Sequence, residues 1–584
     1  MSERDSDLHV RPGRVRDGGA PKGKAKSFVG KVMRAAQRAG HPGSRLSGAG
    51  GGRSTFGRGR LASARAALRS PRRRVLIKAR VARHRGSRFR SAPLATHLSY
   101  LQRDGTSRDG AAGRLFDAKS EDVDGRAFAD RCEADRHHFR FIVSPEDAGQ
   151  MGDLQGFTHD LMAQAERDLG TRLDWVAVTH HNTDNPHVHI LVRGRADDQT
   201  DLVISRDYIG RGLRAQAERL VSLELGPRSE RDIAAALRRE VDAERWTGLD
   251  RTLRGYADDA GGVIDLRPGG AAHDDRQLHD VLVGRAQRLE RLGVTEAIGP
   301  AQWTMATDAE ATLRALGERG DIIKTMHRAL GDRGQSRGVA AFAIHGDSAP
   351  NVTGRLVDRG LQDELTGSAY VVIDGIDGRT HHVRFPDLAA TGDAAIGAIV
   401  EARPFTGADG RQRLALSVRS DLSLAEQITA SGATWLDRHL TARDPAPVAA
   451  TGFGGEVREA LEQRLDRLAS EGLARRRPQG PAFEKDLIAT LRRRELADAA
   501  ARLTKETGLP HRPSGAGDQV AGVYRQRVTL ASGRFVMLDN GLGFELVPWK
   551  PALDQHLGRH IAGVVQPGGT VDWTLGRKRG LGLG

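Results

Sequence analysis

The chain has 584 residues, with 90 Lys and Arg, 75 Asp and Glu, and a single cysteine, Cys132. It is too long for one hydrophobic core, so about three to five domains are expected. One cysteine excludes an intramolecular disulfide and a cysteine-based zinc site, which favours a reducing cytoplasm. No apolar run approaches the ~18–20 residues of a membrane span, and there is no signal-peptide pattern. The sequence therefore predicts a cytoplasmic protein without membrane insertion.

Positive charge is concentrated in the first ninety residues. They hold 25 Lys and Arg against 4 Asp and Glu, a net charge of +21, whereas the rest of the chain has 65 against 71, a net charge of −6. The segment is rich in Gly, Ser and Ala and poor in aromatic residues, so residues 1–70 are predicted to form a disordered basic arm. A flexible polycation binds polyanions through phosphate contacts, so nucleic acid is the expected partner, although a solubilising tail is the simpler alternative.

Residues 71–245 are predicted to form one α/β (α+β) domain, an antiparallel sheet with helices. A strand is predicted at VLIKARV, residues 75–81, and a helix within PLATHLSYLQRDG, residues 93–105. HHFRFIVSP, residues 137–145, alternates as a second strand, and a helix is expected from Glu146–Leu169. Two strands of a hairpin and a further helix complete the domain.

The rest of the chain is predicted to divide into four modules. Two contain a helix that ends at a glycine, followed in the first by a polar turn and AQWTM, which resembles the end of a winged helix, although an ordinary amphipathic helix explains the pattern equally well. Two are β-rich and similar to each other, which suggests small β-barrel-like modules and an internal duplication. His381 and His382 in the first of these are predicted to be structural, without an acidic or histidine partner. The boundaries are 246–345 for the linker and first winged-helix-like region, 346–420 for the first β-rich module, 421–515 for the second winged-helix-like region and 516–584 for the C-terminal β-rich module.

The most specific pattern is THHNTDNPHVHI, residues 179–190. His187 and His189 lie two residues apart on a predicted strand, so their side chains point to the same face. The preceding residues form a second strand, and NTDNP is rich in turn formers, which brings His180 beside the pair. A lone histidine on a strand is usually a satisfied polar residue. Three convergent imidazoles that leave coordination positions open are typical of a catalytic metal site.

Such a site suits polarisation of a phosphoryl oxygen, and the basic arm makes a nucleic-acid phosphodiester the natural target. Water or a side chain must attack, and a tyrosine would form a phosphotyrosyl bond through two reversible transesterifications. Among the five tyrosines, Tyr370 and Tyr524 lie in the β-rich modules and Tyr256 in the linker region. Tyr208 is the weaker of the two remaining candidates, and Tyr100 is preferred.

Tyr100 lies in HLSYLQRDG, just after the first predicted strand. His97, Arg103 and Arg108 are close to it in sequence and are expected to meet DNA phosphates. Arg140, on the strand at residues 137–145, is a further candidate for DNA binding.

The chain resembles the relaxase/mobilization nuclease family of the HUH endonuclease superfamily in three segments, which follow one another along the sequence as SYLQRDG, HHFRFIVSP and THHNTDNPHVHI. The resemblance covers residues 72–245. It implies a five-stranded antiparallel sheet with flanking helices and a Mg²⁺- or Mn²⁺-dependent nick at a transfer origin. It also implies that Tyr100 is the nucleophile that stays joined to the 5′ phosphate, and that His180, His187 and His189 are the metal ligands.

The chain departs from this family at one position. Many relatives carry an acidic residue two positions after the first histidine, where this chain has Asn182. Asp184 is predicted to take that role as a carboxylate that fixes a ligand or helps to accept the tyrosine proton. Alternatively, the metal alone lowers the tyrosine pKa sufficiently.

The resemblance implies a conjugative DNA relaxase, a nicking endonuclease and strand transferase that forms a covalent 5′-phosphotyrosyl intermediate and later rejoins the strand. Its expected partners are single-stranded and supercoiled transfer-origin DNA, auxiliary transfer proteins and a type IV secretion coupling protein. The resemblance also implies that the protein is exported to the recipient cell bound to the DNA. The region beyond residue 250 resembles the C-terminal extension of one relaxase subgroup, a domain of uncharacterised function.

Three alternatives remain. Two are enzymes of the same superfamily, a rolling-circle replication initiator and a transposase. The absence of a GxxxxGK[ST] helicase signature mildly favours mobilisation over these. The third is a non-enzymatic winged-helix DNA-binding protein whose histidines hold a structural metal.

Overall fold

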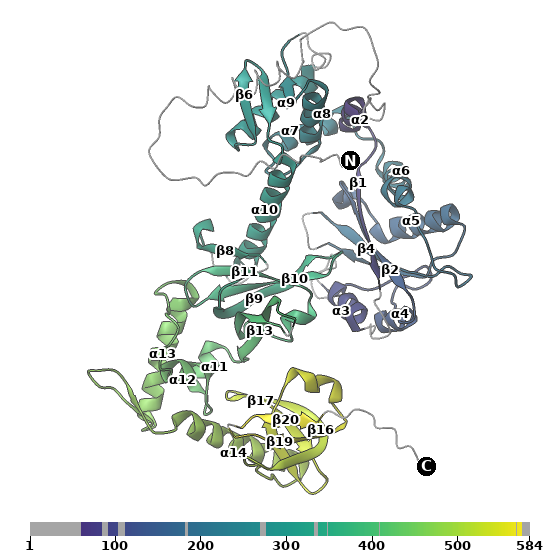
Figure 1. The fold of residues 1–584 in the computed structure, drawn as a ribbon. Coiled ribbons are helices and arrows are strands. Elements are labelled where there is room, and N and C mark those ends of the chain that lie inside the picture. Colours follow the sequence, from purple (N-terminus) through teal and green to yellow (C-terminus); the bar gives the residue numbers. More distant parts are fainter. Residues whose placement is uncertain are drawn as a thin grey trace, which may run out of the picture. The chain divides into compact units, whose positions relative to one another are not determined.

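The fold in Figure 1 is that of a computed structural model of the chain. It is a mixed α/β protein, as predicted, and its described residues form separate sheets of four, six, five, three and two strands. No helix in the described part of the chain is long and apolar enough to cross a membrane. The structure describes residues 60–83, 92–102, 111–181, 185–268, 276–331, 334, 337–346, 349–407, 409–567 and 569–574.

The N-terminal sheet contains the predicted histidine hairpin. Its strands are antiparallel and, in their spatial order, are β1 (Val75–Arg83), β2 (His137–Pro145), β4 (His187–Arg193) and β3 (Trp175–His180). Beyond β3, Phe116 forms a single antiparallel bridge with Ala177. The sheet therefore has four strands and a one-residue bridge, and the expected five-stranded sheet is not confirmed.

Apolar residues alternate along these strands, so both faces of the N-terminal sheet carry packed helices. Phe139, Phe141 and Val143 of β2 belong to the buried cluster beneath α5 and α6. Val178 and Leu191 belong to the cluster on the opposite face, beneath α3 and α4. The four helices are α3 (Ala92–Leu101), α4 (Gly125–Arg131), α5 (Leu154–Leu169) and α6 (Leu213–Leu225).

Helix α5 begins later than its sequence pattern predicted. The expected start was Glu146, but a short 3₁₀ turn (Ala148–Gln150) intervenes. The side chain of Asp153 then accepts hydrogen bonds from two backbone N–H groups of the first helical turn, which fixes the start at Leu154. Gly170 ends the helix with a φ of 67°, a conformation that glycine adopts readily.

Most of the predicted basic arm lies outside the described residues. Its last part differs from the prediction, because α2 (Arg60–Leu68) is a helix. Leu68 is buried in the same cluster as Leu249 and Leu253, and Leu61 packs against that cluster. The boundary at residue 70 was therefore too late, because these leucines bury apolar surface that the high arginine content obscured.

The first helical module combines three helices with a small sheet in the order β5-β7-β6. The predicted helix that ends at a glycine is present, since α9 is followed by Gly293 with a φ of 72°. β6 and β7 then form a hairpin. The elements are α7 (Glu230–Asp242), α8 (Gly248–Asp259), β5 (Val263–Asp265), α9 (Arg276–Arg291), β6 (Thr295–Gly299) and β7 (Gln302–Met305).

The second helical module has the same plan. Its third helix is followed by Gly472 with a φ of 75° and by a two-stranded hairpin. The elements are α11 (Leu424–Thr429), α12 (Trp435–Leu440), α13 (Gly452–Ser470), β14 (Ala474–Arg475) and β15 (Ala482–Phe483).

A shared motif shows that the two helical modules are copies. T-x-L-D-R-x-L occurs at residues 247–253 and 434–440, and in each case its threonine and aspartate form a capping box at a helix start. In the first module, Asp250 also binds the buried Arg285, with 2.7 Å from Nε to Oδ1. In the second module, Arg464 binds the equivalent aspartate at the same distance. Both arginines also donate to three backbone carbonyls at matching offsets from that aspartate.

The two β-rich modules repeat each other in the same way. The six-stranded sheet has the order β13-β12-β9-β10-β11-β8, and the five-stranded sheet has the matching order β20-β19-β16-β17-β18. Gly397 N–H donates to the Leu356 carbonyl at 2.8 Å, and Gly558 N–H donates to the Tyr524 carbonyl at the same distance. Both sheets are open, so the predicted β-barrel-like closure was wrong.

A long helix precedes each of these sheets. We infer that the chain from the first helical module onward is a tandem duplication, as the similarity of the β-rich sequences suggested. The elements are α10 (Ala309–Gly331), β8 (Phe342–His345), β9 (Val352–Asp363), β10 (Ser368–Gly375), β11 (Thr380–Phe385), β12 (Ile399–Thr406), β13 (Gln412–Ser420), α14 (Leu487–Thr507), β16 (Gln519–Leu530), β17 (Gly533–Asp539), β18 (Phe544–Pro548), β19 (His560–Val565) and β20 (Val571–Thr574).

Candidate metal centre

The three histidines predicted from the hairpin lie together on one face of the N-terminal sheet. His180 at the end of β3 pairs with His187 at the start of β4, and His189 lies two residues further along. The distance between the Nε2 atoms of His187 and His189 is 3.1 Å. The ring centre of His180 lies 5.4 Å from that of His187 and 4.4 Å from that of His189. All three side chains are buried.

Backbone carbonyls orient two of these rings. Nδ1 of His187 lies 3.0 Å from the Asn185 carbonyl, and Nε2 of His180 lies 2.8 Å from the Leu101 carbonyl. A carbonyl only accepts, so each of these nitrogens donates its proton, and in the neutral ring the other nitrogen is the one that can bind a metal. Hydrogen bonds of this kind fix the orientation of metal-binding histidines.

A carboxylate from the first β-rich module joins the histidines. Glu364 lies in the turn between β9 and β10, and its Oε2 is 3.1 Å from Nε2 of His189 and 3.5 Å from Nε2 of His187. One ligand atom from each of the four residues lies within 4.8 Å of the others. Sequence reasoning missed this glutamate because its turn, DELTGS, resembles any polar hairpin turn.

The four side chains have the chemistry of a site for a divalent metal. Burial opposes ionisation of Glu364, but the nearby His189 and His187 outweigh it and hold the pKa of the carboxyl far below its usual range. An ionised carboxylate and imidazole nitrogens with free lone pairs are the ligand forms that divalent metals bind. The residues present therefore fit such an ion.

Tyr100 lies near the C-terminal end of α3, next to the residue whose carbonyl holds His180. The backbone N–H of Leu361 donates a hydrogen bond to the Tyr100 hydroxyl at 2.9 Å. The tyrosine ring packs against the cores of both the N-terminal sheet and the first β-rich module. A Cβ added at Gly360 would lie 2.6 Å from the hydroxyl oxygen, so the close approach requires glycine there.

Basic and neutral polar groups surround the histidines on the same face. Arg140 of β2 donates from Nε to Nε2 of His138 at 3.0 Å. Burial, together with the nearby Arg80, lowers the pKa of Arg140 to about 10. Burial also lowers the pKa of His97 well below its usual value, and the positive charge of Arg140 adds to this effect. Among the described residues, no carboxylate forms an ion pair with Arg140.

Four other residues singled out from the sequence fall outside the described residues. They are the predicted carboxylate Asp184, the neighbouring Asn182, and the DNA-binding candidates Arg103 and Arg108. Their predicted roles remain predictions.

Tyr208, the second candidate nucleophile, lies on the other side of the N-terminal sheet. It begins a π-helical turn (Tyr208–Gly212) and packs against the cluster beneath α5 and α6. Its hydroxyl donates to Asp168 at 2.9 Å, and burial together with this carboxylate raises the pKa of the phenol. A raised pKa and a position on the opposite face both disfavour it as the nucleophile at the histidines.

The prediction that His381 has no acidic or histidine partner was wrong. Nε2 of His381 lies 3.0 Å from the carboxylate of Asp377, and its Nδ1 lies 3.0 Å from Nε2 of His345. His345 comes from β8, which joins the sheet as a parallel edge strand that the sequence pattern did not indicate. His382 stacks on Tyr370 in the same sheet, with 5.0 Å between the ring centres.

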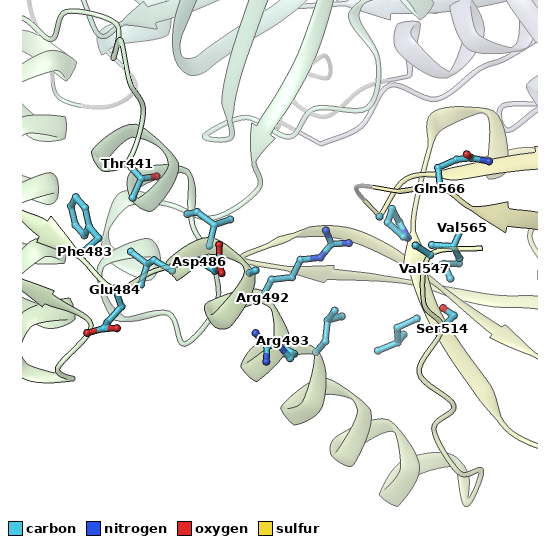
Figure 2. A pocket seen from close by; sticks show the side chains of 18 of the residues that line it. Thr441, Phe483, Glu484, Asp486, Arg492, Arg493, Ser514, Val547, Val565 and Gln566 are labelled. Carbon is cyan, nitrogen blue, oxygen red and sulfur yellow. The ribbon is translucent and has the colours of Figure 1, made fainter. Parts of the chain in front are cut away.

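A separate cavity of about 920 Å³ lies in the second copy of the duplication (Figure 2). Apolar residues of α14, β18 and β19 form much of its wall, and Arg492 extends into it. Glu484 and Asp486 line the cavity as well, so its wall carries both signs of charge. None of the residues of the metal centre lines it.

These observations define a multi-module α/β protein in which a histidine hairpin and a glutamate from a duplicated extension form a candidate metal centre. The family described as "Protein of unknown function (DUF3363)" matches residues 282–412 and 405–582, which together make up just over half of the chain. The chain belongs to this family. No match was found among curated proteins or among solved structures.

Proposed function

We propose that the chain is a conjugative DNA relaxase, which nicks one strand of transfer-origin DNA through Tyr100 and later rejoins it. The observation that carries this proposal is the convergence of His180, His187, His189 and Glu364 within 4.8 Å. The tyrosine helix is tied to this group, because the Leu101 carbonyl accepts the hydrogen bond from His180. The resemblance of residues 72–245 to relaxases supports the same conclusion. The four strands and the bridge at Phe116 would then correspond to the five-stranded sheet of that fold.

Three imidazole nitrogens and one carboxylate would hold the divalent metal. Imidazole-rich sites favour transition metals, so Mn²⁺ is a better match to this set than Mg²⁺. Bound there, the ion would polarise a non-bridging oxygen of the scissile phosphate. The partly buried Arg140 on the same face would neutralise a second phosphate oxygen, because no carboxylate among the described residues pairs with it.

Tyr100 supplies the nucleophile in this proposal. Its phenolic oxygen forms a bond to phosphorus while the bond from phosphorus to the 3′ oxygen breaks, and the phenolic proton ends on the released 3′ hydroxyl. The 5′ phosphate stays on the tyrosine, and the reverse reaction reseals the strand. Leu361 N–H, which donates to the phenolic oxygen at 2.9 Å, would stabilise negative charge that develops there.

Glu364 would take the role that the sequence assigned to Asp184. It is the acidic residue that the structure describes at the histidines, and its low pKa keeps it ionised at neutral pH. As a carboxylate it would supply the negative charge that, in relatives, comes from an acidic residue at the position of Asn182.

A non-enzymatic role is the second candidate, and one observation favours it. Structural metal sites are usually closed by four protein ligands, whereas catalytic sites keep a position open. Glu364 supplies a fourth ligand, so the metal would then only join the first β-rich module to the N-terminal domain. Rolling-circle initiators and transposases share the tyrosine chemistry and differ in the DNA on which they act.

The decisive experiment is a covalent trapping assay. The full-length protein is incubated with Mn²⁺ and 5′- and 3′-labelled single-stranded oligonucleotides that tile the transfer origin, and denaturing gels are searched for a protein–DNA adduct. We expect an adduct that retains the 3′ part of the strand, and its loss in Tyr100→Phe. Tyr208→Phe is the matched control and should form the adduct at the wild-type rate. An adduct that persists in Tyr100→Phe removes the assigned nucleophile, and no adduct with any origin strand favours the structural role.

A further inference from the structure

A groove runs along the outer edge of the N-terminal sheet. This β1 groove has a volume of about 1130 Å³ and lies between β1, α6 and the first helical module. Asn185, whose carbonyl accepts the hydrogen bond from the ligand His187, lines it. The groove therefore borders the turn that carries two of the candidate ligands.

Cationic side chains from five separate elements or connections line the β1 groove. Four carboxylates line it too, but Glu240 is paired with Arg74, and Asp321 lies 3.9 Å from Lys324. Burial raises the pKa of Glu218, and the positive charges of the nearby Arg214 and Arg72 partly offset this rise. The six cations that line the groove are Arg72, Arg74, Arg214, Arg245, Arg251 and Lys324.

Four of these arginines are available to a ligand. Among the residues that the structure describes, the guanidinium groups of Arg72, Arg214, Arg245 and Arg251 form no ion pair with a carboxylate. Nε of Arg214 is buried and lacks a hydrogen-bond partner within the same described part. A buried donor without an acceptor is costly, so an anionic ligand at this point would be stabilising.

The same line of positive charge continues to the metal centre across the open part of the sheet. Lys78 on β1 pairs with Ile142 on β2, which in turn pairs with His189 on β4, so these residues form one row on one face. Lys78 and Arg80 are exposed on this face, and Leu76, half exposed at its edge, lines the groove.

We propose that the β1 groove binds the single-stranded DNA that leads to the nick site, mainly through its phosphates. This inference rests on the proposed nicking function and extends its substrate site to the DUF3363 part of the chain. Positively charged grooves with aromatic side chains are typical of single-strand binding, and Trp246 of the first helical module lines this one. Phosphate contacts of this kind fix the position of a strand without reading its sequence.

The test compares two double variants of the full-length protein. Arg245→Ala/Arg251→Ala removes two exposed, unpaired groove arginines, and Arg411→Ala/Arg443→Ala removes two exposed arginines elsewhere. Binding of a fluorescein-labelled single strand that covers the nick site is followed by anisotropy, with EDTA present, at several NaCl concentrations. The basic N-terminal segment is the same in all proteins, so differences report the groove.

We expect the groove variant to bind about tenfold more weakly than wild type, with a salt slope reduced by about 1.4, the value for two lost contacts to a single strand. The control should bind like wild type. Equal losses in both variants, an unchanged groove variant, no binding by wild type, or displacement of the strand by a poly-glutamate peptide more readily than by unlabelled DNA would each overturn the groove as a DNA site.

The covalent trapping assay separates this inference from the proposed function. If wild type forms the adduct and the groove variant binds DNA normally, only the groove assignment fails. If the groove variant loses binding and wild type forms no adduct with any strand, only the nicking function fails.

Discussion

Burial controls the charge of individual side chains in this protein, and His382 is the clearest case away from the metal centre. Its ring is 1% exposed and stacks on Tyr370. Burial, reinforced by Arg384, lowers its pKa to about 4. The histidine is therefore neutral in the folded protein at a pH where the unfolded chain, with a pKa near 6.5, already binds a proton.

This difference in pKa predicts that the free energy of unfolding falls at acidic pH because of His382. Between pH 6.5 and 4 the unfolded state binds one more proton than the folded state at His382, so the stabilisation present above pH 6.5 is lost as the pH falls. Relative to His382→Phe, wild type should lose up to about 1.4 kcal/mol of unfolding free energy per pH unit in this window. Urea denaturation at pH 7 and pH 5 measures it. The exposed His560, changed to Gln, should leave the pH dependence as in wild type, and an equal slope in His382→Phe would contradict the assignment.

Residue-level prediction worked where the partners lie close in sequence. His187 and His189 share a face because a strand alternates, and a turn of five residues brings His180 beside them. Glu364 could not be predicted, because its contact with the histidines depends on how two modules pack, and no local sequence pattern indicates such packing. The histidine partner of His381 was missed for a similar reason, because β8 pairs in parallel across a long connection. Its acidic partner Asp377 is only four residues away, so the sequence contained that signal.

At the scale of elements, each of the two helical modules has one buried arginine–aspartate ion pair that joins its helices. Arg464 of α13 is 1% exposed and binds Asp437 through two nitrogens, at 2.7 and 2.8 Å. It also donates to the Ile428 carbonyl in the last turn of α11 and to two carbonyls between α11 and α12. One side chain thus joins the third helix to the start of the second and to the end of the first.

Removing this arginine should destabilise the second helical module strongly. Arg464→Met leaves the buried Asp437 carboxylate and three carbonyls without their donor, so we expect a loss of about 3–5 kcal/mol in the free energy of unfolding. Arg467→Met on the same helix is the matched control. Arg467 is half exposed and pairs with Glu471, so its loss should cost about 0.5 kcal/mol or less. Urea denaturation followed by tryptophan fluorescence compares them, and a similar small effect of both would refute the central role of Arg464.

Equivalent hairpin turns of the duplicated sheets have different contacts. In the second copy, the backbone N–H groups of Ala531 and Ser532 donate to Glu495 of α14 at 2.7 and 2.9 Å, so the turn is held within its own copy. In the first copy, the turn at residues 363–368 instead brings Glu364 to the histidines. The strand patterns predicted two similar sheets because alternation repeats, but they did not predict open edges, since closure depends on which strands pair at the ends.

At the scale of the whole molecule, the candidate metal centre belongs to two modules at once. The histidines come from the N-terminal sheet, while Glu364 comes from the region that matches the DUF3363 family. Leu361 N–H, three residues before this glutamate, also binds Tyr100. The domain boundary predicted at residue 245 therefore separates groups that lie within one site.

Metal binding should depend on the distant module. Glu364→Gln removes the negative ligand while keeping its size, and we expect Mn²⁺ affinity, measured by titration calorimetry, to fall by about tenfold or more. Glu459→Gln, at an exposed position in the second helical module, is the matched control and should bind Mn²⁺ like wild type. An unchanged Mn²⁺ affinity in Glu364→Gln would show that the carboxylate lies near the site without binding the metal.

The contact of Glu364 with the imidazoles also has a thermodynamic consequence. If one turn supplies a ligand, metal affinity and the docking of that turn are linked equilibria, and their coupling free energy is the same in both directions. A macromolecule that draws the β9–β10 turn away from the histidines must lower the affinity for the metal ion by some factor. The bound ion must then lower the affinity for that macromolecule by the same factor. The duplicated extension would then act as an effector of the N-terminal domain, joined to it covalently and present at a fixed effective concentration.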